Sequence, residues 1–596
     1  MRPGNGKVAA LLDRFADLLE IEEGNPFRIR AYRNAARVVR DLGTAIADRV
    51  EAGDDLTELP SIGKDIAGLI GEFVRTGGVE RLKELEQRFP ATLVELTRLD
   101  GVGPKRARQL YESLGIASTT DLQNAIQTGA LRGVKGFGAR TEERIARALK
   151  AGRTRDRLLL ADADQYVEPL LAWMRATPGL EIIEAAGSYR RRAETVGDLD
   201  LLAIGARAAP IIRRFVEYPD VDTVVAAGST RASVTLQSGV QVDLRVVPAR
   251  AYGAALHYFT GSKDHNVAIR QRGVARGLRI SEYGIFRVSD AGEAESDDEE
   301  GSRRIGGATE EEVFAAVGLS WITPELREAR GEIEAAERGA LPDLITFDAI
   351  RGDLHTHSTW SDGKDSIEAM ALAARGRGYE YMAVADHSPS ITIARGIGPR
   401  ELERQWQEID GLADVVSGLR ILKGMEVDIL RDGTLDLPDE MLGRLDIVIV
   451  SVHSLMQMSR PEMTRRIIRA IEHPAVHILG HPTGRRLGRR EAYDVDLDAV
   501  FRAAAALGVA VEINSLPQRL DLKDVHARRA RELGTAIVID TDAHSTGALR
   551  FMAHGVDQAR RGWLTAQDVL NTRSLDELLE WLAMRSKGAD AGVDRT

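Results

Sequence analysis

The sequence predicts a multidomain protein with an all-α amino-terminal region, an α+β middle region and a carboxyl-terminal α/β region built as a distorted (βα)7 barrel. Its 596 residues exceed what one hydrophobic core normally holds, so several domains are expected. Helical apolar periodicity, as in VAALLDRFADLLEI and IRAYRNAARVVRDL, is broken by glycine turns and gives way near residue 155 to alternating strands such as QVDLRVV. Beyond residue 350, apolar runs alternate with amphipathic helices, which is typical of a parallel sheet.

The composition excludes several classes of protein. The chain has no cysteine, so disulfides and thiolate zinc sites are excluded and any metal must be held by His, Asp and Glu. The sequence has no apolar run of about 18 residues, so no membrane span is predicted. The amino terminus does not resemble a secretory signal. A cytoplasmic, nucleoid-associated protein is therefore expected. The net charge of −11 decides nothing about nucleic acid, because binding depends on a local basic surface.

The domain boundaries are placed from these changes of pattern. We predict a first helical domain at 1–95, a second helical domain at 96–154, two mixed domains at 155–250 and 251–319, a linker at 320–350, the βα domain at 351–585 and a flexible tail at 586–596. The acidic run EAESDDEEGSRR is expected to be a solvated loop of the fourth segment.

One short glycine-containing motif recurs three times in the helical region: PSIGK at 60–64, LDGVGPK at 99–105 and VKGFG at 134–138. In each, glycines lie between two helices, so the backbone can approach a ligand and the amides of the second helix can hold a phosphate. A plain connection between helices is the competing interpretation, but three copies, each with Lys or Arg nearby, resemble helix-hairpin-helix motifs that bind the DNA backbone without reading sequence. The candidate DNA contacts are Gly63, Lys64, Gly101, Gly103, Lys105, Gly136, Gly138 and Arg140.

Three carboxylates in the 155–250 segment have the pattern of a two-metal site. Asp198 and Asp200 in GDLDLL point to one face if this segment is a strand, and Asp243 lies on the polar face of QVDLRVV. Such a set suits two Mg²⁺ ions (or Mn²⁺) for in-line phosphoryl transfer. Ser188 and Arg191, near an expected helix start, can hold phosphate oxygens. A solvated strand edge with unrelated acids is the competing interpretation.

These segments, with YFTGSKDHN and RISEYGIF, resemble the palm and thumb of family X DNA polymerases. The resemblance implies that residues 96–154 are fingers, 155–250 the palm and 251–319 the thumb, and that the three aspartates are catalytic metal ligands. It implies contacts to the incoming deoxynucleoside triphosphate (dNTP) from Gly187, Ser188, Arg191, Gly197, Tyr258, Phe259, Gly261 and Asn266, and a template contact from Arg270.

The sequence departs from that family at two positions. Lys263 stands where the animal polymerase of the family has an acid, so it is expected to add affinity for the triphosphate. Leu69 stands where that enzyme has its Schiff-base lysine, so deoxyribose-phosphate lyase activity is predicted to be weak or absent. Binding of a 5′-phosphate through Arg28, Tyr32 and Lys64 is still expected.

In the 351–585 segment, apolar runs repeatedly end in a side chain that binds metals. The nine candidate ligands are His355, His357, Asp362, His387, Glu426, His453, His481, Asp542 and His544. Parallel βα units place such residues together at the carboxyl ends of the strands. Imidazole and carboxylate ligands favour Zn²⁺ or Mn²⁺, and nine ligands suffice for two or three ions.

The motifs HTHS, ADHS, GMEVDI, SVH, GHP and DTDAH resemble the PHP (polymerase and histidinol phosphatase) superfamily. The resemblance implies one ion at His355, His357, Glu426 and Asp542, a second at Asp362, His387 and His544, and a third at Glu426, His453 and His481.

Both resemblances together match bacterial family X polymerases that carry a PHP domain. They imply filling of short gaps in DNA during base excision repair by an enzyme that is expected to be monomeric and to act on gapped or primer–template DNA with a 5′-phosphate and dNTPs. They also imply a 3′→5′ exonuclease, with cleavage at abasic sites or removal of 3′-blocking groups as further options. Two alternatives stay open: the PHP half as a phosphomonoesterase for a small molecule, and a non-catalytic scaffold that binds DNA ends.

Overall fold

The computed structural model describes residues 3, 5–42, 44–97, 99, 102–134, 136–150, 157–287 and 304–593. The chain forms two compact units, Met1–Asp156 and Arg157–Thr596, and each is described by itself. Within the described residues, no helix is both long and apolar enough to cross a membrane.

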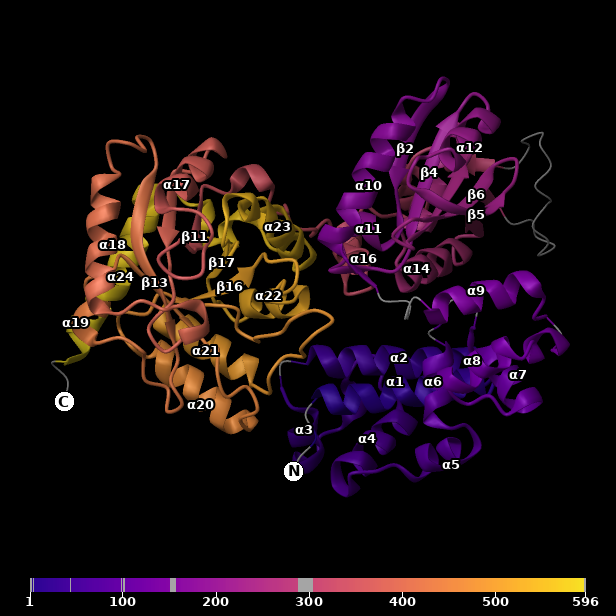
Figure 1. The fold of residues 1–596 in the computed structure, drawn as a ribbon, viewed down its shortest axis with the longest axis horizontal. Helices are drawn as coiled ribbons and strands as arrows, with labels where there is room; N and C mark the ends of the chain where they lie inside the picture. The colour runs from indigo at the N-terminus through magenta and orange to yellow at the C-terminus, as the bar shows by residue number, and fades with distance from the viewer. Residues whose placement is uncertain are drawn as a thin grey trace. The chain divides into compact units, whose positions relative to one another are not determined.

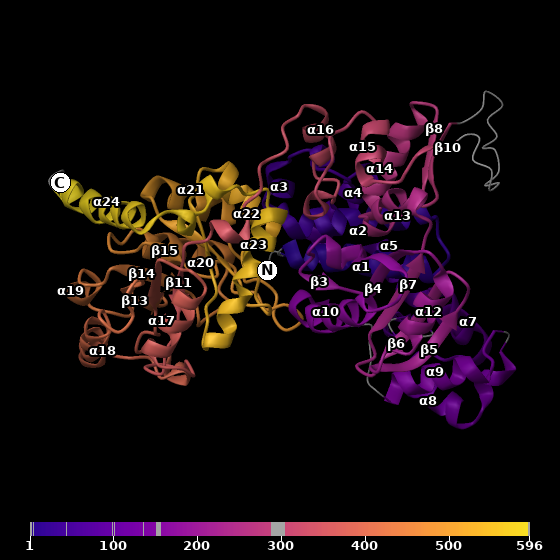
Figure 2. The ribbon, with the colours of Figure 1, turned by 90° about the horizontal axis from the view of Figure 1, so that it is seen from above.

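The amino-terminal unit consists of helices, drawn from indigo to violet in Figures 1 and 2. They are α1 (Asn5–Ile21), α2 (Pro26–Asp41), α3 (Ile46–Ala52), α4 (Lys64–Thr76), α5 (Glu80–Arg88), α6 (Ala91–Thr97), α7 (Pro104–Leu114), α8 (Thr119–Gln127) and α9 (Ala139–Lys150). A single apolar core joins them from Val8 to Ile145. The predicted all-α character of this region is confirmed.

The palm is a five-stranded sheet with strand order β2-β4-β7-β6-β5. Its strands are β2 (Leu180–Ala185), β4 (Leu199–Gly205), β5 (Val221–Ala227), β6 (Arg231–Leu236) and β7 (Gln241–Val246). Strands β4 and β7 run parallel and the other pairs antiparallel, with Asp200 opposite Asp243 in the register. Helices α10 (Leu160–Arg175) and α12 (Ala208–Val216) pack on the apolar face, so the alternate polar residues lie on the other face.

The thumb follows as helices α13 (Tyr252–Thr260), α14 (Lys263–Val274) and α15 (Glu310–Ala316) around a small antiparallel sheet of β8 (Leu278–Ser281), β9 (Gly284–Arg287) and β10 (Arg304–Gly306). The acidic run predicted as a solvated loop lies outside the described residues. The segment predicted as a linker, 320–350, is packed rather than loose: it contains α16 (Glu332–Glu337) and contributes Ile322, Leu326 and Ile333 to the thumb core. Its Arg327 is fully buried and donates two hydrogen bonds to Glu310, at 2.5 and 3.0 Å.

The carboxyl-terminal domain is a nearly closed parallel barrel of seven strands in sequence order, as predicted. The strands are β11 (Gly352–Thr356), β12 (Tyr381–Val384), β13 (Arg420–Asp428), β14 (Ile447–Ser451), β15 (Ile478–Leu479), β16 (Ala510–Asn514) and β17 (Ile537–Asp540). A parallel bridge between Thr356 and Ala543 links the first strand to the segment after the last. Short strands that are buried along their whole length form here because both faces are covered.

Helices surround this barrel in Figure 1. They are α17 (Ile367–Gly376), α18 (Pro399–Gly411), α19 (Asp439–Leu442), α20 (Arg460–Ile471), α21 (Leu497–Leu507), α22 (Asp524–Glu532), α23 (Met552–Arg561) and α24 (Leu575–Val593). Local signals start and stop them: Ser459 and Glu462 form a capping box before α20, and Gly508 ends α21 in the left-handed conformation. Helix α24 continues to Val593, through most of the segment predicted as a tail.

Candidate active sites

The three glycine turns of the amino-terminal unit share one backbone geometry. The amides of Ile62, Val102 and Phe137 each donate to the carbonyl three residues earlier, and these side chains are at most 3% exposed. Gly63 and Gly103 then cap α4 and α7 with nearly identical dihedral angles, φ −84° and ψ 173° against φ −82° and ψ 174°. An apolar anchor therefore fixes each turn, while the exposed glycine opens the next helix toward solvent.

The structure describes the side chains of Lys64 and Lys105 at these turns, but not that of Arg140. Lys64 is exposed, and Lys105 is exposed with Nζ 3.8 Å from Glu23. Gly136 and Gly138 lie in the third turn, and Gly136 adopts a positive φ of 91° that favours glycine. Gly101 lies outside the described residues, as does the side chain of Arg140.

The predicted 5′-phosphate contacts are only partly at the surface. Arg28 on α2 is half-buried, but Tyr32 is 1% exposed and stacks on Phe15 at 4.7 Å, so its burial argues against the predicted contact with DNA. Leu69 is 6% exposed and packs in the helical core, so it offers an alkyl side chain where the lyase reaction needs an amine.

The palm brings the three predicted catalytic carboxylates together at one end of its parallel strand pair. Asp200 of β4 and Asp243 of β7 are paired in register, and Asp198 lies just before β4 rather than within it. Burial, followed by the charges of Asp198 and Asp243, raises the pKa of Asp200 to about 6. Such mutual repulsion is what bound divalent cations relieve. Asp243 is held by Ser233 on β6 and by Gln241, whose Nε2 donates at 2.9 Å.

The predicted phosphate-binding residues lie beside this cluster. Gly187 opens the short helix α11 (Gly187–Arg190) with a φ of 64°, and a Cβ there would approach Asp200 Oδ2 to 2.9 Å. Glycine is therefore required both by the backbone conformation and by the closeness of the carboxylate. Ser188 follows on the same turn, and Gly197 is exposed next to Asp198.

Arg191 is held by the thumb and by the 320–350 segment. Its Nη1 donates to the carbonyl of Thr260 at 2.5 Å, and its Nε donates to Glu328 at 3.1 Å. Glu328 in turn accepts from Arg561 of α23 at 3.1 Å. Burial raises the pKa of Glu328, but Arg561 and Arg191 outweigh it and hold that pKa at about 2.

The thumb residues predicted to hold the nucleotide form one cluster. Tyr258 and Phe259 meet edge to face at 5.1 Å, and Asn266 donates from Nδ2 to the carbonyl of Tyr258 at 2.7 Å. Oδ1 of Asn266 is buried with no hydrogen-bond partner in the described part of the chain. Arg270 lies 5.9 Å from the Tyr258 ring. Two further residues complete the set: Gly261, where a Cβ would lie 3.1 Å from Arg191, and the exposed Lys263 at the start of α14.

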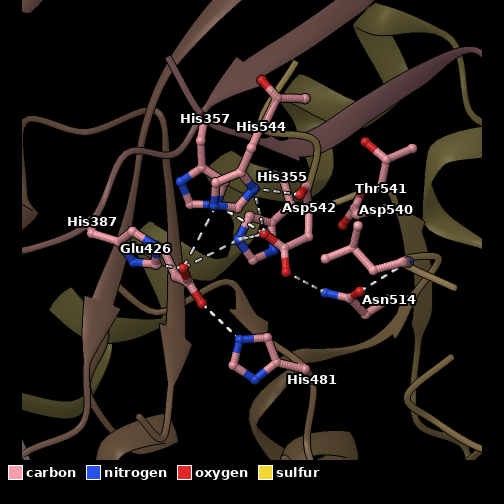
Figure 3. Close-up of polar contacts among 12 residues, drawn as sticks. His355, His357, His387, Glu426, His481, Asn514, Asp540, Thr541, Asp542 and His544 are labelled. Atoms are coloured by element: carbon pink, nitrogen blue, oxygen red, sulfur yellow. Dashed lines mark hydrogen bonds and ion pairs between the residues drawn. The ribbon is translucent and has the colours of Figure 1, made fainter. Parts of the chain in front are cut away.

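The second site lies at the carboxyl ends of the barrel strands (Figure 3). His355 and Glu426 are within β11 and β13, whereas the other seven predicted ligands follow β11, β12, β14, β15 and β17. Residues that are far apart in the chain therefore lie together because the strands that carry them are neighbours in the barrel. Figure 3 shows His355, His357, His387 and His481 arranged around the carboxylate of Glu426.

The donor atoms lie at distances that a shared cation can bridge. Within the described residues, three groups have all donor atoms within 4.8 Å of one another: His357, Asp362, His387 and His544; His355, His357 and Asp542; and His387, Glu426 and His453. His481 joins the last group through Nε2, 2.9 Å from Glu426 Oε1. All nine predicted ligands therefore converge, with His357 and His387 each shared between two groups. The resemblance placed His357 only with Glu426, His355 and Asp542, and His387 only with Asp362 and His544.

The charges in this cluster are interdependent. Burial disfavours charge on His355, but Glu512 and Glu426 outweigh it and raise the pKa of His355 well above its ordinary value. The pKa of His357 falls to about 3 because of burial and the nearby His544 and His387. The pKa of Glu426 is held well below its ordinary value, because three histidines outweigh the effect of burial.

The donor set fits bound metal ions. Nε2 of His355, Nε2 of His357 and Oε2 of Glu426 are buried and make no hydrogen bond within the described chain, although atoms of opposite charge lie within 4.0 Å. Buried polar atoms are normally paired, so unpaired imidazole and carboxylate atoms that face one another indicate a cation site. Such a site lowers the pKa of bound water and stabilises charge on a phosphoester.

A second layer of polar side chains, which was not singled out from the sequence, orients these ligands. Glu512 of β16 lies 2.7 Å from Nδ1 of His355 and accepts the amide of His481 at 2.6 Å. Asn514 donates to Oδ2 of Asp542 at 3.0 Å, and Asp428 lies 3.3 Å from Nδ1 of His453. Such partners fix the tautomer and orientation of a metal-binding imidazole. A signal is present in the sequence GVAVEIN, where the polar residues Glu512 and Asn514 alternate with apolar ones.

Comparison with known proteins identifies four family models and several relatives of this chain. Family models match at residues 3–79 (helix-hairpin-helix domain), 93–151 (SAM-like helix-hairpin-helix tandem), 255–328 (DNA polymerase beta thumb) and 353–515 (PHP domain). Probable phosphatases from Syntrophotalea carbinolica and Thermoanaerobacter sp. are 29% and 30% identical over 39% of this chain and 96% and 95% of their own lengths. The DNA polymerase/3′-5′ exonuclease PolX of Bacillus subtilis is 37% identical over 96% of this chain and 98% of its own length. Because this relative is matched over nearly the whole length of both proteins, the chain belongs to the PolX family of DNA polymerase/3′-5′ exonuclease proteins.

Proposed function

We propose that this chain fills short gaps in DNA during base excision repair and trims DNA 3′ ends in its PHP domain. The single observation that carries the proposal is the presence of two separate charge clusters in one chain. One is the in-register pair Asp200 and Asp243 with Asp198 beside it, and the other is the nine-ligand cluster of the barrel.

In the palm, Asp198, Asp200 and Asp243 would hold Mg²⁺ or Mn²⁺. When bound, the ions activate the 3′ hydroxyl and neutralise the triphosphate for in-line transfer. The chain's own residues then position the nucleotide. Ser188 and Arg191 would bind its phosphates, and Asn266 would bind the base edge through Oδ1, which has no hydrogen-bond partner among the described residues.

In the barrel, the histidines and carboxylates would hold two or three Zn²⁺ or Mn²⁺ ions, which supply a hydroxide nucleophile near neutral pH. Glu512 and Asn514 keep His355 and Asp542 in the ligating orientation. The substrate proposed is the 3′-terminal phosphodiester of DNA, with abasic sites and 3′-blocking groups as related phosphoesters. We further propose that the enzyme works as a monomer in the cytoplasm on nucleoid DNA.

A test compares one-nucleotide gaps with and without a downstream 5′-phosphate, in Mg²⁺ or Mn²⁺, with and without dNTPs. The proposal predicts faster filling when the 5′-phosphate is present and Mn²⁺-stimulated 3′ degradation when dNTPs are omitted. Equal rates of filling for both gaps would rule out the proposed 5′-phosphate contact. No incorporation on either would overturn the repair role.

A second candidate for the barrel is a small-molecule phosphomonoesterase, favoured by its similarity to the probable phosphatases. Rates on histidinol phosphate and on a DNA 3′ end separate the two, since the proposed nuclease prefers the DNA end.

A further inference from the structure

Two loops beside the metal ligands of the barrel are joined to each other. The loop after β15 (482–490) and the loop after β16 (515–522) are connected by the amide of Leu487, which donates to the carbonyl of Gln518 at 2.7 Å. Oγ1 of Thr483 donates to Asp521 at 2.9 Å, and Arg485 donates to the carbonyl of Leu520. Arg485 also donates to Glu194 of the palm at 2.8 Å, so the first loop contacts both the second loop and the palm.

Arg519 in the second loop reaches the metal ligands. It is 7% exposed, and its Nε lies 3.4 Å from Oδ2 of Asp542 without forming a hydrogen bond in the described structure. The two oxygens of Asp542 face different ways. Oδ1 lies 3.1 Å from Nε2 of His357, while Oδ2 faces Asn514 and Arg519. Arg519 is therefore on the edge of the ligand cluster, beside Asp542.

Arg486 and Arg490 in the first loop add positive charge at the same place. The amide of Arg486 donates to the carbonyl of Arg490 at 2.8 Å, so both residues belong to one tight turn. Nε of Arg486 is buried without a hydrogen-bond partner within the described residues. The hydrogen bond from Leu487 to Gln518 joins the loops that carry Arg486 and Arg519, and burial, followed by the charge of Arg519, lowers the pKa of Arg486.

This arrangement leaves guanidinium donors available for an anion besides Asp542. Arginine stays protonated, so the like charges of Arg486 and Arg519 cannot be removed by deprotonation. They stand next to ligands that fit metal cations, and their buried Nε–H groups donate no hydrogen bond among the described residues, although Nε of Arg519 lies 3.4 Å from Oδ2 of Asp542. A buried N–H group without a hydrogen bond is costly, whereas a phosphate oxygen accepts several guanidinium hydrogen bonds at once.

We propose that Arg486 and Arg519 form a phosphate-binding subsite for the DNA 3′ end beside the PHP metal ligands. The anion is a phosphate monoester or diester, either the terminal phosphodiester of the strand or a 3′-phosphate that blocks it. This inference rests on the proposed nuclease function and assigns its substrate contacts to this chain's own residues.

The test uses the full-length protein with Arg486→Gln, Arg519→Gln and Arg519→Lys. Arg377→Gln is the matched control, because Arg377 is exposed and follows the carboxyl end of α17, at the opposite end of the barrel from the metal ligands. Steady-state 3′ processing is measured with Mn²⁺ on single-stranded oligonucleotides that end in a 3′-hydroxyl or a 3′-phosphate. Binding of a fluorescent trinucleotide, with and without a 3′-phosphate, is measured by anisotropy in EDTA. Gap filling reports that each variant is folded.

The expected result is a KM about 10- to 100-fold higher for Arg486→Gln and Arg519→Gln, with a smaller change in kcat, because these variants cannot make charge-assisted hydrogen bonds to phosphate. Arg519→Lys recovers part of the affinity, and the trinucleotide Kd rises in parallel with KM. A defect limited to 3′-hydroxyl substrates assigns the subsite to the phosphodiester, and a defect limited to 3′-phosphate substrates assigns it to the monoester.

KM and Kd values within about twofold of those of Arg377→Gln in both variants would overturn the subsite while leaving the nuclease function standing. If the wild-type protein degrades no DNA, the nuclease function fails, and the anisotropy values still decide whether the two arginines bind phosphate.

Discussion

Arg192 in the palm donates a 2.7 Å hydrogen bond to Asp557 on α23, a residue 365 positions later in the chain. Arg192 also lies 3.3 Å from Asp164, which is itself paired with His554 of α23 at 2.9 Å. The palm and the barrel domain therefore share a network of part-buried ion pairs. Arg561 extends this network to the carbonyl of Arg191, so the proposed triphosphate-binding arginine is positioned in part by the PHP domain.

The Arg192–Asp557 pair predicts non-additive stability changes. Arg192→Met should lower the Tm because it leaves the part-buried Asp557 without this partner, and Asp557→Asn should lower it because Arg192 then keeps only the charge of Asp164. The double variant should lose less than the sum. The coupling is expected to be roughly 1 to 3 kcal/mol. Thermal unfolding of the four proteins checks it, and strictly additive shifts would show that the pair contributes no coupling.

Glu512 predicts a change in metal affinity without the removal of any ligand. Glu512→Gln should weaken Mn²⁺ or Zn²⁺ binding about 10- to 100-fold, because the partner that orients His355 loses its charge. Isothermal titration calorimetry measures this, with Glu440→Gln on α19 as an exposed control. Affinity equal to that of the control would mean that Glu512 does not tune the site.

The hairpin lysines predict a change in salt dependence. The slope of log K against log salt is negative, and replacing Lys64 or Lys105 with alanine should reduce its magnitude by about 1 for each DNA phosphate that the lysine neutralises. Fluorescence anisotropy with gapped DNA over a range of salt concentrations gives the slope. Lys83→Ala on α5 is the control, since Lys83 is exposed and paired with Glu80 outside the glycine turns. An unchanged slope for Lys64→Ala would remove that residue from the interface.

The buried Leu69 predicts that little or no Schiff base forms. Borohydride treatment of the protein with DNA carrying a 5′-deoxyribose phosphate should trap no substantial covalent adduct, because no amine stands at that position. A robust adduct, mapped by mass spectrometry to another lysine, would contradict the prediction and identify the nucleophile.

The sequence predicted the elements that depend on local pattern. The barrel strands and the convergence of the nine candidate ligands follow from short apolar runs that end in His, Asp or Glu, because parallel strands bring such ends to one edge. The carboxylate pair Asp200 and Asp243 follows in the same way from two alternating strands.

Contacts made across long distances in the chain were not predictable. The local sequence around Tyr32 does not show whether its ring faces solvent or Phe15. Only tertiary packing places the ring in the core. The 320–350 segment was predicted as a linker, yet its Arg327 is buried and paired with Glu310. The hydrogen bond between Arg192 and Asp557 likewise depends on two domains packing together.

The central claim is that one chain carries two independent active sites. The most direct measurement compares Asp243→Ala and His355→Ala on a one-nucleotide gap, scoring extension with dNTPs and Mn²⁺-dependent 3′ degradation without them. We predict that Asp243→Ala loses extension and keeps degradation, and that His355→Ala does the reverse. Loss of both activities in either variant, in protein that remains folded, would contradict the claim.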